Sequence, residues 1–230
     1  MKKKLAVLSG AGISAESGIK TFRDAGGLWE GHDIMEVASP EGWRKNPELV
    51  LDFYNKRKRQ LKEAKPNRAH AAIAELEAVL DVYIITQNVD DLHEKAGSKN
   101  VLHLHGELLK ARSTKNENYI IDWTEDLNLG HFDDKGNQLR PHIVWFGEAV
   151  PALGEAAEII MEADYVIIAG TSMQVYPAAG LIDYAGPKAK LFYIDPKPAT
   201  IYGLKNKIEV IAETASKGME IVREKMLRSL

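Results

Sequence analysis

Short apolar runs recur along the chain and alternate with amphipathic stretches that have helical spacing. Seven of these runs have the length and the aliphatic character of buried strands, at residues 5–8, 82–86, 101–104, 142–146, 165–170, 191–194 and 208–211. Near-continuous apolar strands are typical of a parallel sheet that is covered on both faces. The intervening stretches predict helices at 13–19, 46–63, 66–79, 152–162 and 214–229. This alternation indicates an α/β fold with an open, mostly parallel sheet and helices on both faces.

Two regions depart from the alternation of strands and helices. Residues 30–65 are mostly helical in pattern, and residues 108–141 are polar, irregular and rich in turn residues. We expect both to be insertions at the edge of the sheet that together form a smaller lobe. The expected main domain therefore comprises residues 1–30, 66–107 and 142–230, and the expected small lobe comprises residues 31–65 and 108–141.

Composition excludes several classes of protein. No apolar run approaches the roughly 20 residues that a membrane span needs, and the apolar run at the N-terminus is too short for a signal peptide. A net charge of −3 gives no sign of general nucleic-acid binding. The chain has no cysteine, which excludes disulfides, thiolate zinc sites and a cysteine nucleophile. We expect a cytoplasmic protein with neither a membrane nor a nucleic acid as partner.

A glycine-rich loop follows the first predicted strand. Its glycines, Gly10 and Gly12, let the backbone turn tightly and approach a pyrophosphate. A dehydrogenase would also need a second strand that ends in an acidic residue about 20 positions further on. The segment that follows here, KTFRDAGGLWEGHD, is charged, glycine-rich and not a strand. The loop is therefore either a dinucleotide site of another geometry or a plain glycine turn.

Polar residues follow most of the predicted strands. They are Gln87, Asn88 and Asp90 after the second run, His105 and Gly106 after the third, Gly170, Thr171 and Ser172 at the end of the fifth, and Asp195 after the sixth. Ligands of open α/β sheets bind at the carboxyl ends of the strands. Asn, Asp, Gly and Ser are also common turn residues, but their presence at so many strand ends favours a binding site.

Five separate segments of the chain resemble the signature motifs of the sirtuins, the NAD-dependent protein lysine deacylases. The segments are GAGISAESGIKTFRDAGGLW, TQNVDDLHEKAG, VLHLHGEL, LRPHIVWFGE and IIAGTSMQVYPAAG. They span about residue 5 to about residue 216 in the order of the family. Within the family the chain is most similar to the bacterial and mitochondrial-like class that removes acidic acyl groups. The resemblance implies a Rossmann-like main domain.

The resemblance also implies the chemistry. NAD would be consumed as a co-substrate, and the partners would be acyl-lysine proteins or peptides. The acyl oxygen would attack the ribose carbon that carries nicotinamide, and the products would be free lysine, nicotinamide and O-acyl-ADP-ribose. His105 would be the general base that acts on a ribose hydroxyl, because an imidazole titrates near neutral pH. Asn88 and Asp90 would act at the nicotinamide and ribose end of NAD.

The resemblance assigns further residues to cofactor binding. They are Gly10, Ala11, Gly12, Ile13, Ala15, Phe22, Arg23 and Trp29 at the phosphates and the cofactor loop, Gln87 at the ribose, and Gly170, Thr171, Ser172, Val175, Asp195 and Ala215 on the adenosine side. Family members often have asparagine where this chain has Asp195. His103 lies two residues before His105, so both would point to the same side of a strand. We expect His103 to support the base or to pack.

A Tyr-x-x-Arg pair lies in the predicted helix 46–63. Tyr54 and Arg57 are three residues apart and share one face. In the acidic-acyl class such a pair binds the distal carboxylate of succinyl- or malonyl-lysine, and acetyl groups are expected to be weaker substrates. A guanidinium can hold a carboxylate with two hydrogen bonds, and a phenol adds one more donor. The alternative is a solvated basic run with an aromatic residue that packs inward.

A second substrate element is implied by the WFGE segment. Val144, Trp145, Phe146 and Gly147 match the part of the family that pairs with the substrate peptide as an added strand.

The chain departs from most sirtuins because it lacks the four cysteines of the structural zinc site. Ser113 lies where the first of them would be expected, and we predict a zinc-free lobe. His131, Asp133, Asp134 and His142 could bind a metal in principle, but this spacing reads better as a turn. The candidate apolar replacement is Tyr119, Ile120, Ile121, Trp123, Leu127, Leu129 and Phe132.

Two other functions remain open from the sequence. One is a protein ADP-ribosyltransferase that uses the same NAD site, and the other is a non-catalytic NAD-sensing module. We expect a monomer, because the chain has no long terminal extension.

Overall fold

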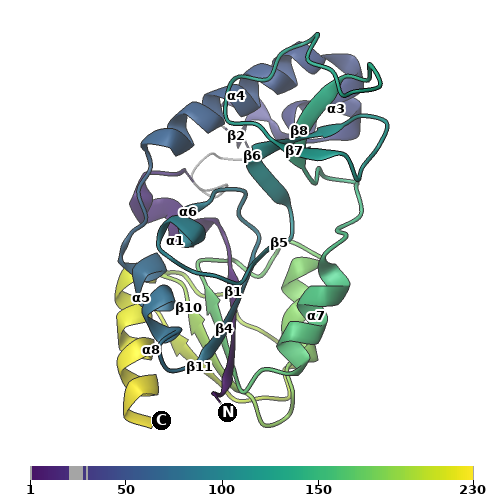
Figure 1. The fold of residues 1–230 in the computed structure, drawn as a ribbon. Helices are drawn as coiled ribbons and strands as arrows, with labels where there is room; N and C mark the ends of the chain where they lie inside the picture. The colour runs from purple at the N-terminus through teal and green to yellow at the C-terminus, as the bar shows by residue number, and fades with distance from the viewer. Residues whose placement is uncertain (1, 21–27, 30, 230) are drawn as a thin grey trace. The chain divides into compact units, whose positions relative to one another are not determined.

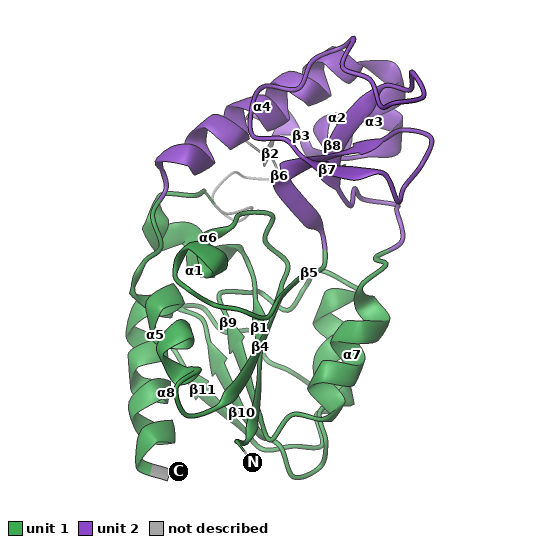
Figure 2. Ribbon diagram, viewed as in Figure 1, with its two compact units in different colours: residues 1–20, 65–104, 150–230 green, residues 21–64, 105–149 purple. Residues whose placement is uncertain are grey.

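The computed structural model describes residues 2–20, 28–29 and 31–229. It divides into two compact units (Figure 2), unit 1 with residues 1–20, 65–104 and 150–230, and unit 2 with residues 21–64 and 105–149. Each unit is built from separate stretches of the chain. Residues 105–107 and 142–149, expected in the main domain, belong to unit 2, and residue 65, expected in the small lobe, belongs to unit 1.

Unit 1 is built on a six-stranded parallel sheet (Figure 1) with the order β11-β10-β9-β1-β4-β5. The strands are β1 (Lys4–Ser9), β4 (Asp81–Thr86), β5 (Val101–His103), β9 (Tyr165–Ala169), β10 (Lys190–Ile194) and β11 (Ile208–Ile211). Every neighbouring pair is parallel. The chain builds outward from β1 in one direction and from β9 in the other. The prediction of an open, mostly parallel, Rossmann-like sheet is confirmed. The sheet is doubly wound, and its switch point lies between β1 and β9.

Helices cover both faces of this sheet. They are α1 (Ala11–Ser14), α5 (Arg68–Leu76), α6 (Leu92–Lys95), α7 (Leu153–Met161) and α8 (Ala215–Ser229), with the 3-10 segments η1 (Ala15–Ser17) and η3 (Ala178–Tyr184). Leu5 and Val7 of β1 pack with residues of α5 and α8, whereas Ala6 and Leu8 pack with residues of α7 and η3. Both faces of the sheet are therefore buried, which explains the near-continuous apolar strands.

Unit 2 combines helices with two small antiparallel sheets. Its helices are α2 (Ile34–Val37), α3 (Pro40–Lys45) and α4 (Pro47–Glu63); β2 (Leu28–Trp29) pairs with β3 (His32–Asp33), and β6 (Gly106–Ser113) lies between β7 (Ile120–Asp122) and β8 (Leu139–Ile143). Helix α4 begins as the sequence predicts. Asn46 Oδ1 accepts a hydrogen bond from the backbone N–H of Leu49 at 3.0 Å, and Pro47 occupies the first turn.

Three sequence predictions are corrected. The run 142–146 is not a strand of the parallel sheet, because β8 ends at Ile143 and pairs antiparallel with β6. The region 108–141 contains strands and is not wholly irregular. The predicted helix 13–19 instead begins at Ala11, continues after Ser14 as the 3-10 segment η1 and ends before Gly18, whose left-handed backbone with φ +84° stops it.

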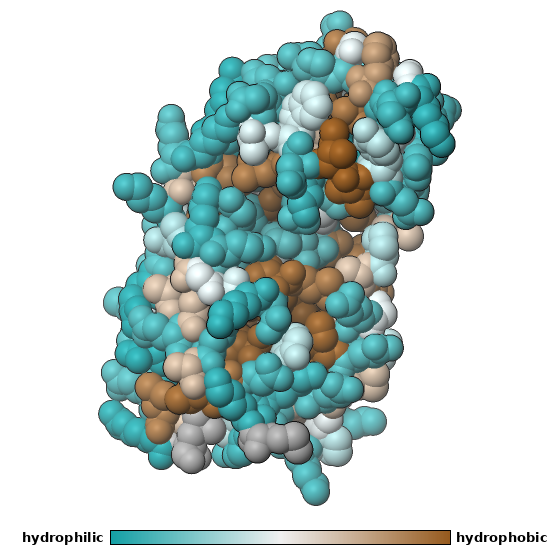
Figure 3. Space-filling view, in the orientation of Figure 1, coloured by the Kyte–Doolittle hydropathy of each residue, from teal (hydrophilic) through white to brown (hydrophobic). Residues whose placement is uncertain are grey.

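The surface in Figure 3 is mainly hydrophilic, and hydrophobic side chains gather in small areas of each unit. Small exposed apolar areas of this kind are normal on a folded protein. None of the helices that the structure describes has the length and apolarity to cross a bilayer.

Candidate active site

Two glycine loops pack against each other at the switch point of unit 1. The N–H of Gly12 donates to the carbonyl of Gly170 at 2.7 Å, and the N–H of Gly10 donates to Ala169 at 3.1 Å. A Cβ on Gly12 would lie 2.7 Å from the Gly170 oxygen, and a Cβ on Gly10 would lie 2.7 Å from Thr171 Cβ. The close approach of the loops therefore requires these glycines. The N–H groups of Gly10 and Gly12, which were expected near phosphate, already donate to carbonyl groups of the protein.

A buried polar cluster joins the loop after β1 to the loop after β4. Ser14 Oγ donates to Asp90 Oδ2 at 3.0 Å, and the Asn88 amide donates to Ser14 Oγ at 3.1 Å and to the Gly10 carbonyl at 3.2 Å. Burial raises the pKa of the Asp90 carboxyl, and hydrogen bonds from Leu92 and Ser14 oppose this rise. The structure thus brings Asn88, Asp90 and Gly10 together. Our sequence reasoning missed Ser14, although it lies inside the first motif.

A second buried layer supports this cluster. Thr86 Oγ1 accepts hydrogen bonds from Ser9 Oγ at 2.9 Å and from the N–H of Asn88 at 3.1 Å. Ser9 also meets His93 Nε2 at 2.9 Å, and the His93 ring lies 4.9 Å from that of His70. Burial lowers the pKa of both imidazoles, to about 4 for His70. Both rings are therefore neutral at pH 7 and act as structural groups.

The residues expected on the adenosine side lie around the ends of β9 and β10. Gln87 Nε2 contacts Thr171 Oγ1 at 3.2 Å, and Tyr193 donates to the Thr171 carbonyl at 3.1 Å. Asp195 is buried and accepts from the N–H of Lys197 at 2.8 Å. Ala215 is the buried first residue of α8.

The remaining cofactor candidates differ in exposure. Ile13 is fully buried in the core, Ala15 and Val175 are exposed, and Ala11 and Ser172 are half-buried. Phe22, Arg23 and the side chain of Trp29 lie outside the described residues.

The two histidines of VLHLHG have different settings. His103 ends β5, and its Nδ1 lies 3.0 Å from the Asn88 carbonyl while its Nε2 lies 2.8 Å from Glu94 Oε1. His105 follows in unit 2, is half-buried, and accepts a hydrogen bond from the N–H of Val144 at 2.9 Å. The expectation that both rings point to the same side rested on both histidines lying in one strand, but β5 ends at His103 and His105 lies beyond it. His103 supports the backbone of Asn88.

Tyr54 and Arg57 are buried residues of α4. Tyr54 has no exposed surface and Arg57 is 9% exposed, whereas Lys56 and Arg59 on either side are exposed. The Arg57 guanidinium lies 5.8 Å from the centre of the Phe53 ring. The alternative of a solvated basic run therefore describes Lys56 and Arg59 and does not describe Arg57.

The segment after β8 is tightly bonded within unit 2. The N–H groups of Val144, Trp145 and Phe146 donate to the His105 carbonyl, to Glu148 Oε2 at 2.8 Å and to the Ala38 carbonyl at 3.0 Å. A peptide that pairs with this segment would find these three donors engaged. Gly147 is exposed and adopts φ +90°.

A hydrogen-bonded turn occupies the region where zinc ligands were considered. Asp133 Oδ1 accepts from the N–H groups of Lys135 at 2.9 Å and Asn137 at 2.7 Å. Burial acts to raise the pKa of Asp133, but hydrogen bonds from Ser113, Asn137 and these amides lower it to about 2. Among the described residues, no three His, Asp or Glu side chains are arranged to hold a metal.

The predicted apolar replacement is only partly correct. Tyr119, Ile121, Trp123 and Leu127 join a core cluster with Leu51, Ala111 and Leu139. Ile120, Leu129 and Phe132 are exposed and do not join this cluster.

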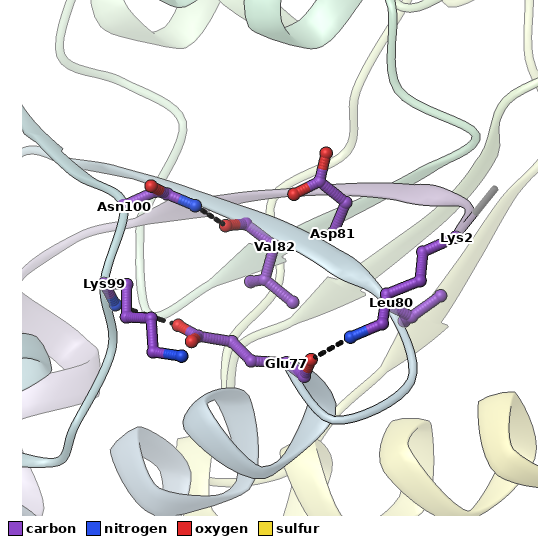
Figure 4. Close-up of a pocket in the computed structure, with 7 residues that line it drawn as sticks. All are labelled: Lys2, Glu77, Leu80, Asp81, Val82, Lys99 and Asn100. Atoms are coloured by element: carbon purple, nitrogen blue, oxygen red, sulfur yellow. Dashed lines mark hydrogen bonds between the residues drawn. The ribbon is translucent and has the colours of Figure 1, made fainter.

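A cavity of about 420 Å³ lies at the opposite edge of unit 1 (Figure 4). Its lining includes Lys2, Asp81 and Asn100, at the amino ends of β1, β4 and β5, and Glu77 at the end of α5. Lys2 donates to the Glu77 carbonyl at 2.7 Å. None of the motif residues lines this cavity, so we assign the site to the carboxyl ends of the strands instead.

Comparison with known proteins gives a consistent result. Residues 10–177 match the model of the Sir2 family. An "NAD-dependent protein deacylase" of Helicobacter pylori (strain ATCC 700392 / 26695) is 60% identical over 225 residues, which cover 98% of both chains.

Solved structures agree in fold. A Sir2 homologue mutant in complex with ADP-ribose has a TM-score of 0.89 and 37% identity, over 99% of this chain and 93% of the other. A Sir2 homologue in complex with NAD has a TM-score of 0.87 and 39% identity, over 99% of this chain and 91% of the other.

Proposed function

Because the chain belongs to the Sir2 family and is an NAD-dependent protein deacylase, we propose that it acts preferentially on succinyl- and malonyl-lysine and more weakly on acetyl-lysine. The observation that carries this proposal is the burial of Tyr54 and Arg57 on one face of α4. An arginine side chain is rarely buried unless it binds an anion or packs on an aromatic ring.

The chemistry of this pair suits a terminal carboxylate. A guanidinium donates two parallel hydrogen bonds to a carboxylate, and such charge-assisted bonds are about twice as strong as neutral ones. The Tyr54 phenol adds a third donor. An acetyl group ends in a methyl, which accepts no hydrogen bond, so it gains nothing from either side chain. The pair therefore favours acyl chains that end in a carboxylate.

We propose that His105 is the general base and that Asn88 and Asp90 orient the nicotinamide and ribose end of NAD. NAD supplies the ribosyl carbon that the acyl oxygen attacks as nicotinamide leaves. His105 would take the proton of a ribose hydroxyl, which then attacks the acyl carbon. The support for this role is that Ser14 Oγ donates to Asp90 and accepts from the Asn88 amide, which fixes both side chains before NAD binds.

We also propose that this deacylase folds without structural zinc. The support is the Asp133 turn with Ser113 and Asn137 and the apolar cluster of Leu127, together with a sequence that has no cysteine. These contacts supply the cross-links that a metal would otherwise provide.

The test is a mass-spectrometric time course on one peptide that carries acetyl-, malonyl- or succinyl-lysine, with and without NAD. Arg57→Met keeps the length of the side chain without its charge, and Arg59→Met is the matched control on the exposed face of the same helix. We expect Arg57→Met to lower kcat/KM for the succinyl peptide by at least about tenfold, as the loss of a charged hydrogen bond implies. Arg59→Met should leave it unchanged.

His105→Ala should abolish turnover of all three peptides. A wild-type enzyme that prefers acetyl, with no effect of Arg57→Met, would contradict the proposed acyl preference and leave the deacylase activity standing. Release of nicotinamide with ADP-ribose attached to protein, and no deacylated lysine, would point to ADP-ribosyl transfer.

A further inference from the structure

The Tyr54 hydroxyl is committed to one hydrogen-bonding role. Trp145 Nε1 lies 3.1 Å from the Tyr54 oxygen, at a buried contact between residues 91 positions apart. An indole N–H only donates, so the phenol oxygen must accept this bond. Among the described residues, the contact with Trp145 is the one hydrogen bond that the structure gives to the Tyr54 hydroxyl, so the phenol proton remains available to donate elsewhere. Burial raises the pKa of Tyr54, which keeps that proton in place.

Trp145 itself is held on three sides. Its backbone N–H donates to Glu148 Oε2 at 2.8 Å, and the Arg140 guanidinium lies 3.4 Å from the centre of its indole ring. The ring centroids of Trp43 and Trp145 are 5.8 Å apart. The side chain is 2% exposed. The indole is therefore fixed in orientation before any substrate arrives.

The groups that hold Trp145 are fixed in turn by an ionic cluster. Glu148 accepts hydrogen bonds from Arg140 at 2.8 and 2.9 Å and from Arg112 at 3.1 Å. Arg140 also donates to the Ile143 carbonyl at 2.8 Å. Burial acts to raise the pKa of Glu148, but these arginines outweigh it and lower the pKa, so the cluster stays charged at neutral pH. A bonded chain thus runs from β6 and β8 through Trp145 to α4.

We propose that Trp145 is a specificity-determining positioning residue, whose indole N–H orients the Tyr54 hydroxyl so that its proton points to the distal carboxylate of an acidic acyl group. The inference rests on the proposed acyl pocket of Tyr54 and Arg57. Without the indole N–H, no donor holds the phenol oxygen, and the O–H bond of Tyr54 can rotate freely. Trp145 acts through Tyr54 and does not itself contact the acyl carboxylate.

The first test is Trp145→Phe, which keeps an aromatic ring against Arg140 and removes the N–H donor. The readout is the ratio of kcat/KM for the succinyl peptide to kcat/KM for the acetyl peptide, so that any general effect on peptide binding cancels. We expect this ratio to fall by about threefold to tenfold, as the loss of one neutral hydrogen bond implies, mainly through KM of the succinyl peptide. Trp123→Phe, a change in the same unit with no contact to Tyr54, is the control and should keep the ratio.

A double-mutant cycle separates positioning from general damage. Tyr54→Phe alone should lower the ratio. Trp145→Phe should lower it no further in that background, because both changes remove the same oriented Tyr54 hydroxyl. Additive effects on the ratio, or an equal loss for both peptides in Trp145→Phe, would overturn the inference.

A spectroscopic measurement tests the bond itself. The four tryptophans each give one indole N–H resonance in a ¹H–¹⁵N spectrum, and the Trp145 peak is assigned by its loss in Trp145→Phe. Tyr54→Phe should move this peak, while Arg59→Met should not. If the peak moves but the wild-type enzyme shows no acidic-acyl preference, the proposed function fails and this inference falls with it. If the preference holds and Trp145→Phe leaves the ratio intact, the inference alone fails.

Discussion

Gly106 shows how strongly one position next to the proposed base is constrained. Its backbone lies in the left-handed region with φ +81°, and a Cβ there would overlap the carbonyl oxygen of His142. Gly136 shares the conformation, with φ +79°, but a Cβ there meets nothing within 4 Å. The two glycines therefore separate the cost of conformation from the cost of overlap.

Gly106→Ala should lower the free energy of unfolding by about 3 kcal/mol, the sum of a strained backbone and an overpacked contact. Gly136→Ala should lower it by about 1 kcal/mol, because only the backbone term applies. Urea denaturation of both variants measures the difference. Equal destabilisation would show that the backbone next to His105 can relax, contrary to our account.

Single residues were predicted from the sequence where spacing alone decides their position. Tyr54 and Arg57 share a helix face because they are three residues apart, and Asn88 and Asp90 follow a strand end. The bond between Trp145 and Tyr54 joins residues 91 positions apart, and the bond between Ser14 and Asp90 joins residues 76 apart. Local patterns carry no information about such pairs, because they form only when separate elements pack.

The elements of unit 2 show where sequence patterns mislead. The run 142–146 is as apolar as the strands of the parallel sheet, yet only its first two residues belong to β8. Val144, Trp145 and Phe146 bond instead to His105, Glu148 and Ala38. Hydrogen bonds to residues outside the run therefore determine its structure. The start of α4 at Asn46 depends only on neighbouring residues of the same helix and was predicted correctly.

The turn at Asp133 provides an element-scale test of the zinc proposal. Protein prepared without chelators should carry no stoichiometric zinc by elemental analysis, and EDTA should not change its thermal midpoint. Asp133→Ala should lower that midpoint clearly more than Asp134→Ala, because Asp134 is exposed while Asp133 accepts hydrogen bonds from Lys135 and Asn137. One zinc per chain, or a loss of structure in EDTA, would contradict the proposal.

Across the whole molecule, buried neutral histidines link stability to pH. Burial lowers the pKa of His70 and His142 to about 4 and that of His93 well below its usual value. In the unfolded chain these groups titrate near pH 6.5. The native state therefore binds fewer protons than the unfolded state between about pH 6.5 and pH 4. Their contribution to stability is full above pH 6.5 and is lost as the pH falls toward 4.

We expect the free energy of unfolding to decrease from pH 7 to pH 5, before most carboxylates titrate. His70→Gln should remove about 2 kcal/mol of this decrease. Glutamine can still accept the hydrogen bond that the N–H of Asn67 gives to His70 at 3.3 Å, so the start of α5 is preserved. Urea midpoints at the two pH values measure the effect. An unchanged pH dependence in His70→Gln would show that folding does not lower the pKa of this histidine.

The sheet of unit 1 was predictable because both of its faces are buried, so each strand appears as a continuous apolar run. The strand order and the switch point between β1 and β9 required the structure, because β1 pairs with β4 and β9 while the next strands in the chain lie in unit 2. The sequence also did not reveal that His105 and the segment 142–149 lie in unit 2, because this depends on bonds between separate segments of the chain.

The most direct measurement is a competition in one tube. Equimolar succinyl and acetyl forms of one peptide are incubated with wild-type protein and limiting NAD, and both peptides, nicotinamide and the acyl-ADP-ribose products are followed by mass spectrometry. Our account predicts that the succinyl peptide is consumed first, with one nicotinamide released and one O-succinyl-ADP-ribose formed for each lysine freed. Consumption of the acetyl peptide first, or of both at equal rates, would contradict it.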